Sequence, residues 1–207
     1  MKRRNFIKSS SLLSSAFILP GYTFKTKKNI YNDKIKLSLV GCGGRGTGAV
    51  INALNADDNI ELISMCDVFE DRIERSLNNL KDEFKGTSKI QVKNENCFTG
   101  FDGYKKTIDN ADVVILATPP GFRPQHFEYA VNSSKHVFVE KPVATDISGI
   151  KRFIESAKIV KKKKLNVGAA IGTNLDDIER AKSLIDNGCD LIVIDTAHGH
   201  SKKVLET

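Results

Sequence analysis

The chain has 207 residues, of which 40% are hydrophobic and 28% charged, and its net charge is +7. This length allows one or two domains with a buried core, and the hydrophobic share excludes a largely disordered chain. No apolar run reaches the roughly 18 residues of a membrane-spanning helix, which excludes a polytopic membrane protein. The four cysteines (Cys42, Cys66, Cys97 and Cys189) form no C-x-x-C pair, so neither a zinc site nor a dense disulfide framework is indicated.

Residues 1–33 are typical of a targeting segment followed by a linker. The basic run KRRNFIK (2–8) precedes a Ser- and Leu-rich stretch at 9–19 that is too short to span a membrane. Paired arginines followed by Phe-Ile-Lys resemble the twin-arginine export signal. This resemblance implies an exported, periplasmic protein with no stable membrane anchor after cleavage. An N-terminal amphipathic helix or anchor that is never cleaved is the alternative.

Apolar runs alternate with helical periodicity between Lys34 and Val167. Continuous apolar runs predict strands at 36–40, 60–66, 112–118 and 136–140. Spacings of three and four predict helices from Thr47 onward and over 70–84, 124–132 and 146–160. Such a succession indicates an α/β fold with a doubly wound parallel sheet in the strand order 3-2-1-4-5-6. The pattern at 176–195 predicts one further helix and one further parallel strand at the sheet edge.

The four consecutive lysines at 161–164 allow two interpretations. They are either a nucleic-acid-binding patch or the solvated end of a helix that precedes a buried strand. No aromatic residue interleaves the run to stack on bases, which favours the helix end and predicts no nucleic-acid partner.

A glycine motif provides the first indication of chemistry. The residues Gly41, Gly43 and Gly46 satisfy G-x-G-x-x-G between a strand and a helix, and Asp67 follows 21 residues after Gly46. The three glycines allow, in order, a tight turn, the approach of a pyrophosphate and close helix–strand packing. A tight turn without a ligand is the alternative. Because a carboxylate accepts hydrogen bonds from a ribose and repels a 2′-phosphate, the predicted cofactor is NAD rather than NADP. The predicted cofactor-binding residues here are Gly41, Gly43, Gly44, Arg45, Gly46 and Asp67.

Two later segments end strands at the sheet edge where ligands bind in open α/β folds. Thr118 and Pro119 end the strand 112–118, and His126 begins the following helix. Glu140 and Lys141 end the strand 136–140. We expect Thr118, Pro119, Glu140 and Lys141 around a nicotinamide, with His126 also in the cofactor site and Lys141 within reach of a substrate hydroxyl. The alternatives are a surface lysine at a strand end and a histidine that only packs or caps a helix.

Together these motifs resemble the glucose–fructose oxidoreductase / inositol dehydrogenase (Gfo/Idh/MocA) family over residues 34–167. The resemblance implies an NAD(P)-binding Rossmann domain and an NAD(P)-dependent oxidoreductase acting on a sugar or cyclitol hydroxyl. It also implies that Lys141 is catalytic. Some members of the family use bound NAD in a glycosidase cycle, so this activity is an alternative to the oxidoreductase. Exported members with twin-arginine signals agree with the N-terminus. The family's second α/β domain, which supplies the remaining catalytic and substrate-binding residues, is not expected in this sequence, and the oligomeric state is left open.

The last forty residues resemble a different family. The segments 167–172, 176–187 and 191–201 resemble two successive strands of the IMP dehydrogenase (β/α)8 barrel and the helix between them, within an expected fragment at 168–207. In that family the residue matching Asp195 lies near the nicotinamide. The family's catalytic cysteine and phosphate loops lie beyond the matched strands, and Cys189 does not match that cysteine. His198 and His200 form an H-x-H with no third ligand at a convincing spacing, so no metal site is expected.

Two functions are therefore expected to compete. One is an NAD(P)-dependent sugar or cyclitol oxidoreductase, here without its substrate domain. The other is a catalytically silent dinucleotide-binding fragment from a fused or truncated gene. An IMP dehydrogenase fragment is a third reading.

Overall fold

The computed structural model describes residues 34–172, 175–186 and 189–194. Within this part of the chain the strands form one parallel sheet in the order β3-β2-β1-β4-β5-β6-β7. The predicted order 3-2-1-4-5-6 and the added edge strand are confirmed. The strands are β1 (Ile35–Val40), β2 (Ile60–Asp67), β3 (Cys97–Thr99), β4 (Val113–Leu116), β5 (His136–Val139), β6 (Val167–Ile171) and β7 (Leu191–Ile194).

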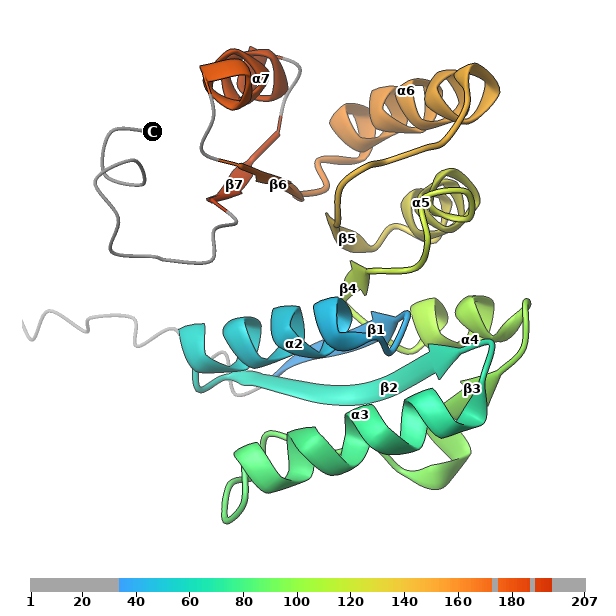
Figure 1. Cartoon of the computed structure of the whole chain (residues 1–207), viewed down its shortest axis with the longest axis vertical. Coiled ribbons are helices and arrows are strands. Elements are labelled where there is room, and N and C mark those ends of the chain that lie inside the picture. The colour runs from blue at the N-terminus through green and yellow to red at the C-terminus, as the bar shows by residue number, and fades with distance from the viewer. Residues whose placement is uncertain (1–33, 173–174, 187–188, 195–207) are drawn as a thin grey trace, which may run out of the picture. The chain divides into compact units, whose positions relative to one another are not determined.

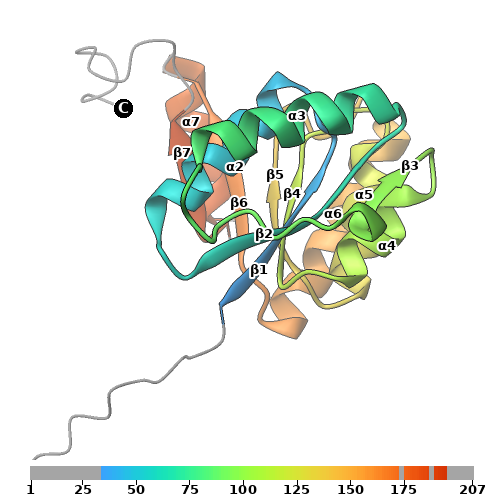
Figure 2. The same cartoon turned by 90° about the horizontal axis from the view of Figure 1, so that it is seen from below.

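Helices connect the strands and cover both faces of the sheet, as a doubly wound fold requires (Figure 1). Figure 2 shows α2 and α3 on one face and α4, α5 and α6 on the other. The helices are α2 (Gly44–Ala56), α3 (Glu70–Glu83), α4 (Gly103–Asp109), α5 (Arg123–Asn132), α6 (Ile147–Lys163) and α7 (Leu175–Asp186), with a short 3-10 turn at Asn94–Asn96.

The hydrophobic core is divided between the two faces. Side chains alternate along each strand, so Leu37 and Leu39 of β1 pack with α2 and α3, whereas Val40 packs on the opposite face with α4 and α5. In β4, Ile115 belongs to the first cluster and Leu116 to the second. Because both faces are buried, the strands are predominantly apolar, and this pattern identifies them in the sequence.

Several predicted elements differ from the structure by one to three residues at their ends, such as the strand 112–118, which spans Val113–Leu116, and two further predictions also differ. The first helix begins at Gly44 rather than Thr47, because Gly43 is its extended N-cap and the glycines and arginine of the first turn contribute no apolar periodicity. The sequence pattern predicts no residue range for the third strand or for the helix after it. That strand has three residues, none of them fully buried, and α4 has seven, so neither leaves a pattern long enough to read.

The lysine run ends a helix, as predicted. Lys161, Lys162 and Lys163 form the last turn of α6, Lys164 is its left-handed C-cap, and β6 follows shortly after. The Lys163 ammonium donates to the carbonyls of Val131 and Asn132, which close α5. Its role in the described structure is thus to join two helix ends.

The predicted edge strand pairs in parallel with β6, with Ile192 opposite Ala169 and Ile194 opposite Ile171. β6 begins at Val167, so it spans the expected boundary between the Rossmann domain and the C-terminal fragment. The signal at 1–33, Asp195 and the two histidines His198 and His200 lie outside the described residues. Among the helices that the structure describes, none has the length and apolar character to cross a membrane.

Candidate functional site

A groove of about 560 Å³ opens at the carboxyl ends of β1, β2 and β4. Its volume falls in the range of small-molecule and cofactor sites. The structure brings six predicted site residues together in its lining: Gly41, Gly43, Asp67, Thr118, Pro119 and His126. The other predicted residues (Gly44, Arg45, Gly46, Glu140 and Lys141) do not line this groove.

The glycine turn is shaped by two close approaches and one open position. Gly41 has φ +99°, and a Cβ there would lie 2.7 Å from the Thr118 nitrogen. A Cβ on Gly46 would lie 2.2 Å from the Gly41 carbonyl oxygen, so the fold itself requires both glycines. A Cβ on Gly43 would meet no protein atom within 4 Å. Nothing in the described fold explains glycine at that position, which leaves room for a ligand against the backbone.

The start of α2 has no cap from its own side chains. Gly43 provides no capping side chain, and the first turn contains no acidic residue. The unpaired N–H groups of a helix start and its positive dipole end favour an anion. Together with the open space at Gly43, this arrangement can accept a phosphate group.

Asp67 also has a structural role, as a hydrogen-bond acceptor for two backbone N–H groups, that could not be predicted from the sequence. Its Oδ2 accepts a 2.8 Å hydrogen bond from the Cys42 N–H, and its Oδ1 accepts one from the Phe69 N–H. The carboxylate therefore holds the glycine turn beside the end of β2. It remains half-buried in the groove lining, where its oxygens can still accept a ribose hydroxyl.

His126 is buried beneath the groove. Its Nδ1 lies 3.2 Å from the Thr118 hydroxyl, and its ring packs against the Tyr104 ring, tilted by 33° with the ring centroids 4.2 Å apart. Burial lowers the pKa of His126 to about 4 because the charged ring would lose its hydration. A neutral His126 fixes the Thr118 side chain, and this packing corresponds to one of the two interpretations of this residue.

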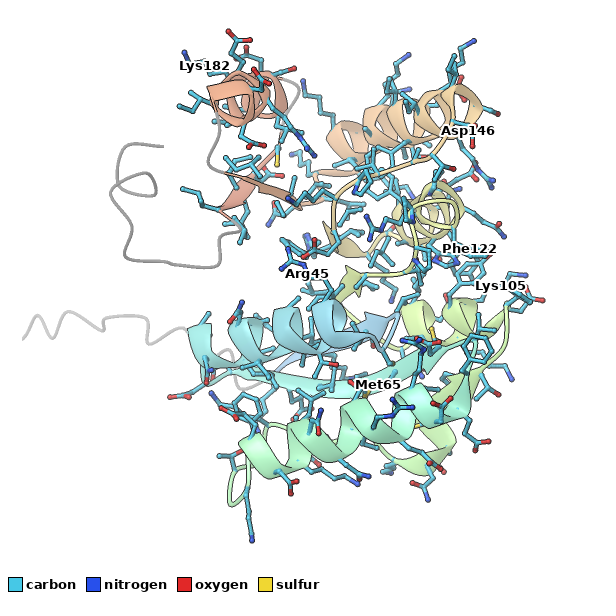
Figure 3. The ribbon with its side chains drawn as sticks, viewed as in Figure 1. Arg45, Met65, Lys105, Phe122, Asp146 and Lys182 are labelled. Carbon is cyan, nitrogen blue, oxygen red and sulfur yellow. The ribbon has the colours of Figure 1, made fainter. Side chains whose placement is uncertain are left out.

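The two other motifs meet through an ion pair. Arg45 Nη2 lies 3.6 Å from Glu140 Oε2, and Glu140 is buried whereas Arg45 is half-exposed. Figure 3 shows Arg45 extending from the first turn of α2 toward the side where β5 lies. Lys141 follows Glu140 two residues beyond the end of β5 and is partly buried, and its peptide bond to Pro142 is cis. The glycine motif is thus linked to the segment that carries Lys141.

Arg123 is a site residue that sequence reasoning missed. Its side chain is buried in the groove lining, where it donates from Nε to the Thr118 carbonyl and from Nη1 to the carbonyls of Glu140 and Pro142. Burial lowers the pKa of this guanidinium, and the nearby Glu140 partly opposes that effect. No local spacing identifies such a residue, because its acceptors are backbone carbonyls.

The groove also has an aromatic rim that the sequence analysis did not single out. Phe69, Phe101 and Phe122 line it and are all exposed, with Phe69 at 60% and Phe101 at 68%. The ring centroids of Phe101 and Phe122 lie 5.9 Å apart. Exposed aromatic side chains at the mouth of a groove provide flat apolar surface for a planar ligand.

The cysteines near the groove are not reactive groups. Cys42 and Cys66 are buried, and burial raises the pKa of both thiols, that of Cys66 to about 12. Both stay protonated at neutral pH and are poor nucleophiles. Within residues 34–172, 175–186 and 189–194, no three His, Cys, Asp or Glu side chains gather as a metal site would require.

Comparison with known proteins gives two kinds of match. The family model described as "IMP dehydrogenase / GMP reductase domain" matches residues 46–207. This match begins long before residue 167, where the motifs place the start of that resemblance, and it leaves out Gly41 and Gly43. Inosine-5′-monophosphate dehydrogenase of Aquifex aeolicus is 42% identical over 105 residues, which is 45% of this chain and 21% of that protein.

The other matches concern proteins of a different name. A glycosyl hydrolase family 109 protein of Streptomyces coelicolor is 29% identical over 126 residues, which is 60% of this chain and 25% of that protein. The solved myo-inositol dehydrogenase of Lactobacillus casei, in complex with NAD(H) and myo-inositol, has a TM-score of 0.52 at 19% identity and covers 65% of this chain and 36% of its own. This likeness shows a shared fold. The chain spans between about a fifth and two fifths of the lengths of these proteins.

Proposed function

This chain belongs to the IMP dehydrogenase / GMP reductase domain family, and we propose that it is an oxidoreductase chain that binds a nicotinamide dinucleotide at the carboxyl edge of its sheet. The observation that carries the proposal is the groove in which Gly41, Gly43, Asp67 and Thr118 come together. In doubly wound sheets, dinucleotides bind in the crevice outside the carboxyl ends of the strands, where the strand order reverses. Here the reversal lies between β1 and β4.

The residues present fit such a cofactor. The open space at Gly43 and the uncapped start of α2 receive the pyrophosphate, and Asp67 accepts the hydroxyls of the adenosine ribose. The carboxylate of Asp67 repels a 2′-phosphate, so we propose NAD rather than NADP. Thr118 and Pro119 bound the groove on the β4 side, and Glu140 and Lys141 lie at the end of the next strand. When bound, a nicotinamide accepts or donates a hydride.

The proposed substrate group is the hydroxyl of a sugar or cyclitol, as in the Gfo/Idh/MocA family that the motifs resemble. Support comes from the shared fold of an inositol dehydrogenase and from the similarity to a family 109 glycosyl hydrolase. In this role the Lys141 ammonium hydrogen-bonds the substrate hydroxyl and helps to remove its proton. A dinucleotide-binding chain without turnover is the competing proposal, and IMP is a further candidate substrate because of the IMP dehydrogenase relatives.

The test is a calorimetric titration of NAD and of NADP into the purified chain, Asp67→Ala and Asp112→Ala. Asp112 is a matched control because its carboxylate also accepts a backbone N–H, that of Lys36, at the opposite edge of the sheet. We expect saturable NAD binding that Asp67→Ala weakens and Asp112→Ala leaves unchanged. Equal NAD affinity in all three proteins would remove Asp67 from the site, and no saturable binding at all would refute the proposal.

Turnover then separates the two competing functions. NADH formation is followed by absorbance with a panel of cyclitols and sugars and, separately, with IMP. Activity with a cyclitol or sugar supports the proposed sugar or cyclitol oxidoreductase. Activity with IMP alone supports IMP as the substrate instead. NAD binding without any turnover supports the silent chain.

We also propose that the N-terminal segment directs export. The basis is the pair Arg3 and Arg4 followed by Phe6 in the sequence. Fractionation of cells that express the full chain and the double variant Arg3→Lys, Arg4→Lys tests this, because a twin-arginine receptor reads the arginines themselves. Periplasmic protein that disappears in the double variant is the expected result.

A further inference from the structure

Arg123 is placed where neither helix formation nor burial favours a cation. It is the first residue of α5, at the end of the helix whose dipole is positive, and the first turn holds no acidic residue. The residue is only 5% exposed. A charged group removed from water is costly unless hydrogen bonds compensate it, so its contacts must explain its presence.

Those contacts join two loops that are far apart in the sequence. Nε donates to the Thr118 carbonyl at 2.7 Å, just beyond β4, and Nη1 donates to the Glu140 carbonyl at 2.7 Å, just beyond β5. Nη1 also donates to the carbonyl of Pro142. The guanidinium is a planar fork with fixed donor directions. It therefore sets how the two loops lie relative to each other.

The joined loops carry the residues that we propose surround the nicotinamide. Thr118 lines the groove, and the peptide between Glu140 and Pro142 carries Lys141. The Glu140 side chain in turn pairs with Arg45 of the glycine motif. Three loops at the carboxyl edge are thus connected through two arginines, and Arg123 is the buried one of the two.

We propose that Arg123 is a positioning residue that holds the Thr118 loop and the Lys141 loop in the relative arrangement that cofactor binding requires. The inference rests on the proposed function for its consequence, and on the described contacts alone for its structural part. A lysine at this position keeps the charge but has neither the second donor nitrogen nor the planar fork. It can satisfy only part of the three-carbonyl arrangement.

The experiment compares the full chain with Arg123→Lys, with Arg152→Lys and with Val160→Ala. Arg152 is a matched arginine whose Nε bonds to Glu128 at the exposed surface of α6. Val160 is buried in a core cluster with Phe127 of α5 and does not line the groove, so its truncation controls for a loss of stability alone. Hydrogen–deuterium exchange is measured for the segments 117–122 and 140–146, followed by NAD titration.

We expect Arg123→Lys to speed amide exchange in both segments and to raise the NAD dissociation constant about tenfold, which corresponds to about 1.4 kcal/mol. Arg152→Lys should change neither, and Val160→Ala should alter exchange without confining the change to these two segments. Exchange in both segments equal to that of the unaltered chain would overturn the inference. If the unaltered chain binds no NAD, the proposed function fails, while the exchange measurement still decides the role of Arg123.

The role of Arg123 can also be tested without a folded variant. The Nε–H signal of Arg123 in a nitrogen-15 spectrum of the unaltered chain reports directly on its bond to Thr118. Slow solvent exchange of that proton relative to the Nε–H of the exposed Arg75 supports the inference. Exchange as fast as at Arg75 would overturn it, even if Arg123→Lys does not fold.

Discussion

Gly43, Gly46 and Gly48 lie close together at the start of α2, but they have different surroundings. Alanine substitutions at these positions can therefore distinguish a glycine that the fold requires from one that a ligand requires. A Cβ on Gly46 would lie 2.2 Å from a backbone oxygen and 2.9 Å from Leu39 Cδ1. A Cβ on Gly43 or on Gly48 would meet nothing within 4 Å. Replacing each glycine with alanine therefore adds the same methyl group to three different environments. The series tests fold and binding separately.

The expected magnitudes follow from these contacts. Overpacking costs about 1–3 kcal/mol, and a clash with rigid backbone places Gly46→Ala at about 3 before helix propensity returns up to about 1. The net loss of about 2 kcal/mol lowers the melting temperature by about 4–8 °C. Gly43 has φ −75° and ψ 174°, which alanine adopts freely, so Gly43→Ala should change stability by less than about 0.5 kcal/mol. Gly48→Ala, inside α2, should stabilise by up to about 1 kcal/mol.

NAD affinity should respond to a different glycine than stability does. The methyl group in Gly43→Ala occupies the space into which we place the pyrophosphate, so its NAD dissociation constant should rise at least about tenfold. Gly48→Ala should bind as the unaltered chain does. Urea unfolding followed by circular dichroism and calorimetric titration measure both quantities. Unchanged NAD affinity in Gly43→Ala would refute the placement of the pyrophosphate, and unchanged stability in Gly46→Ala would refute the steric reasoning.

Two further predictions concern single side chains. Burial holds the pKa of His126 at about 4, below its unfolded value of 6.5, so the unfolded chain binds the extra proton first. The stability that comes from neutral His126 is complete above pH 6.5 and is lost as the pH falls to 4, by up to about 3 kcal/mol; urea unfolding at several pH values should show this slope, and His126→Gln should remove it. Lys141→Met should leave NAD affinity nearly unchanged and reduce any turnover by about 10²–10⁴-fold; undiminished turnover would leave Lys141 a structural role only.

Structural features could be predicted from the sequence where a single physical requirement determines the residue type at a position. Gly41 is required by a positive φ, and the apolar strands are required by burial on both faces, so both could be predicted. The third strand and α4 were missed because a short, partly exposed segment has no periodic pattern. Their position had to come from pairing, with Met65 opposite Cys97.

The site shows the same limit more sharply. Asp67 was identified from its place after a strand, but its hydrogen bond to the Cys42 N–H was not, because any residue at 42 except proline provides that donor. Arg123 was missed for the same reason, since all three of its acceptors are backbone carbonyls. A hydrogen bond between a side chain and the backbone restricts the residue type only at the position that provides the side chain, and not at the position that provides the backbone group. A single sequence therefore shows the residue types of a site better than the bonds that hold it together.

The C-terminal unit shows how far local pattern determines fold. Residues 167–194 form a strand, a helix and a strand whose sequence resembles part of a closed barrel, yet in this structure they extend an open sheet. Local periodicity specifies which face is buried and does not specify curvature or closure, so such a unit suits either architecture. Here β6 is placed by its pairing with β5, Val137 opposite Val167, and Gly168 admits the Phe138 ring, which a Cβ at that glycine would approach to 3.0 Å. The position of this unit is thus decided by contacts with residues some thirty positions earlier in the chain.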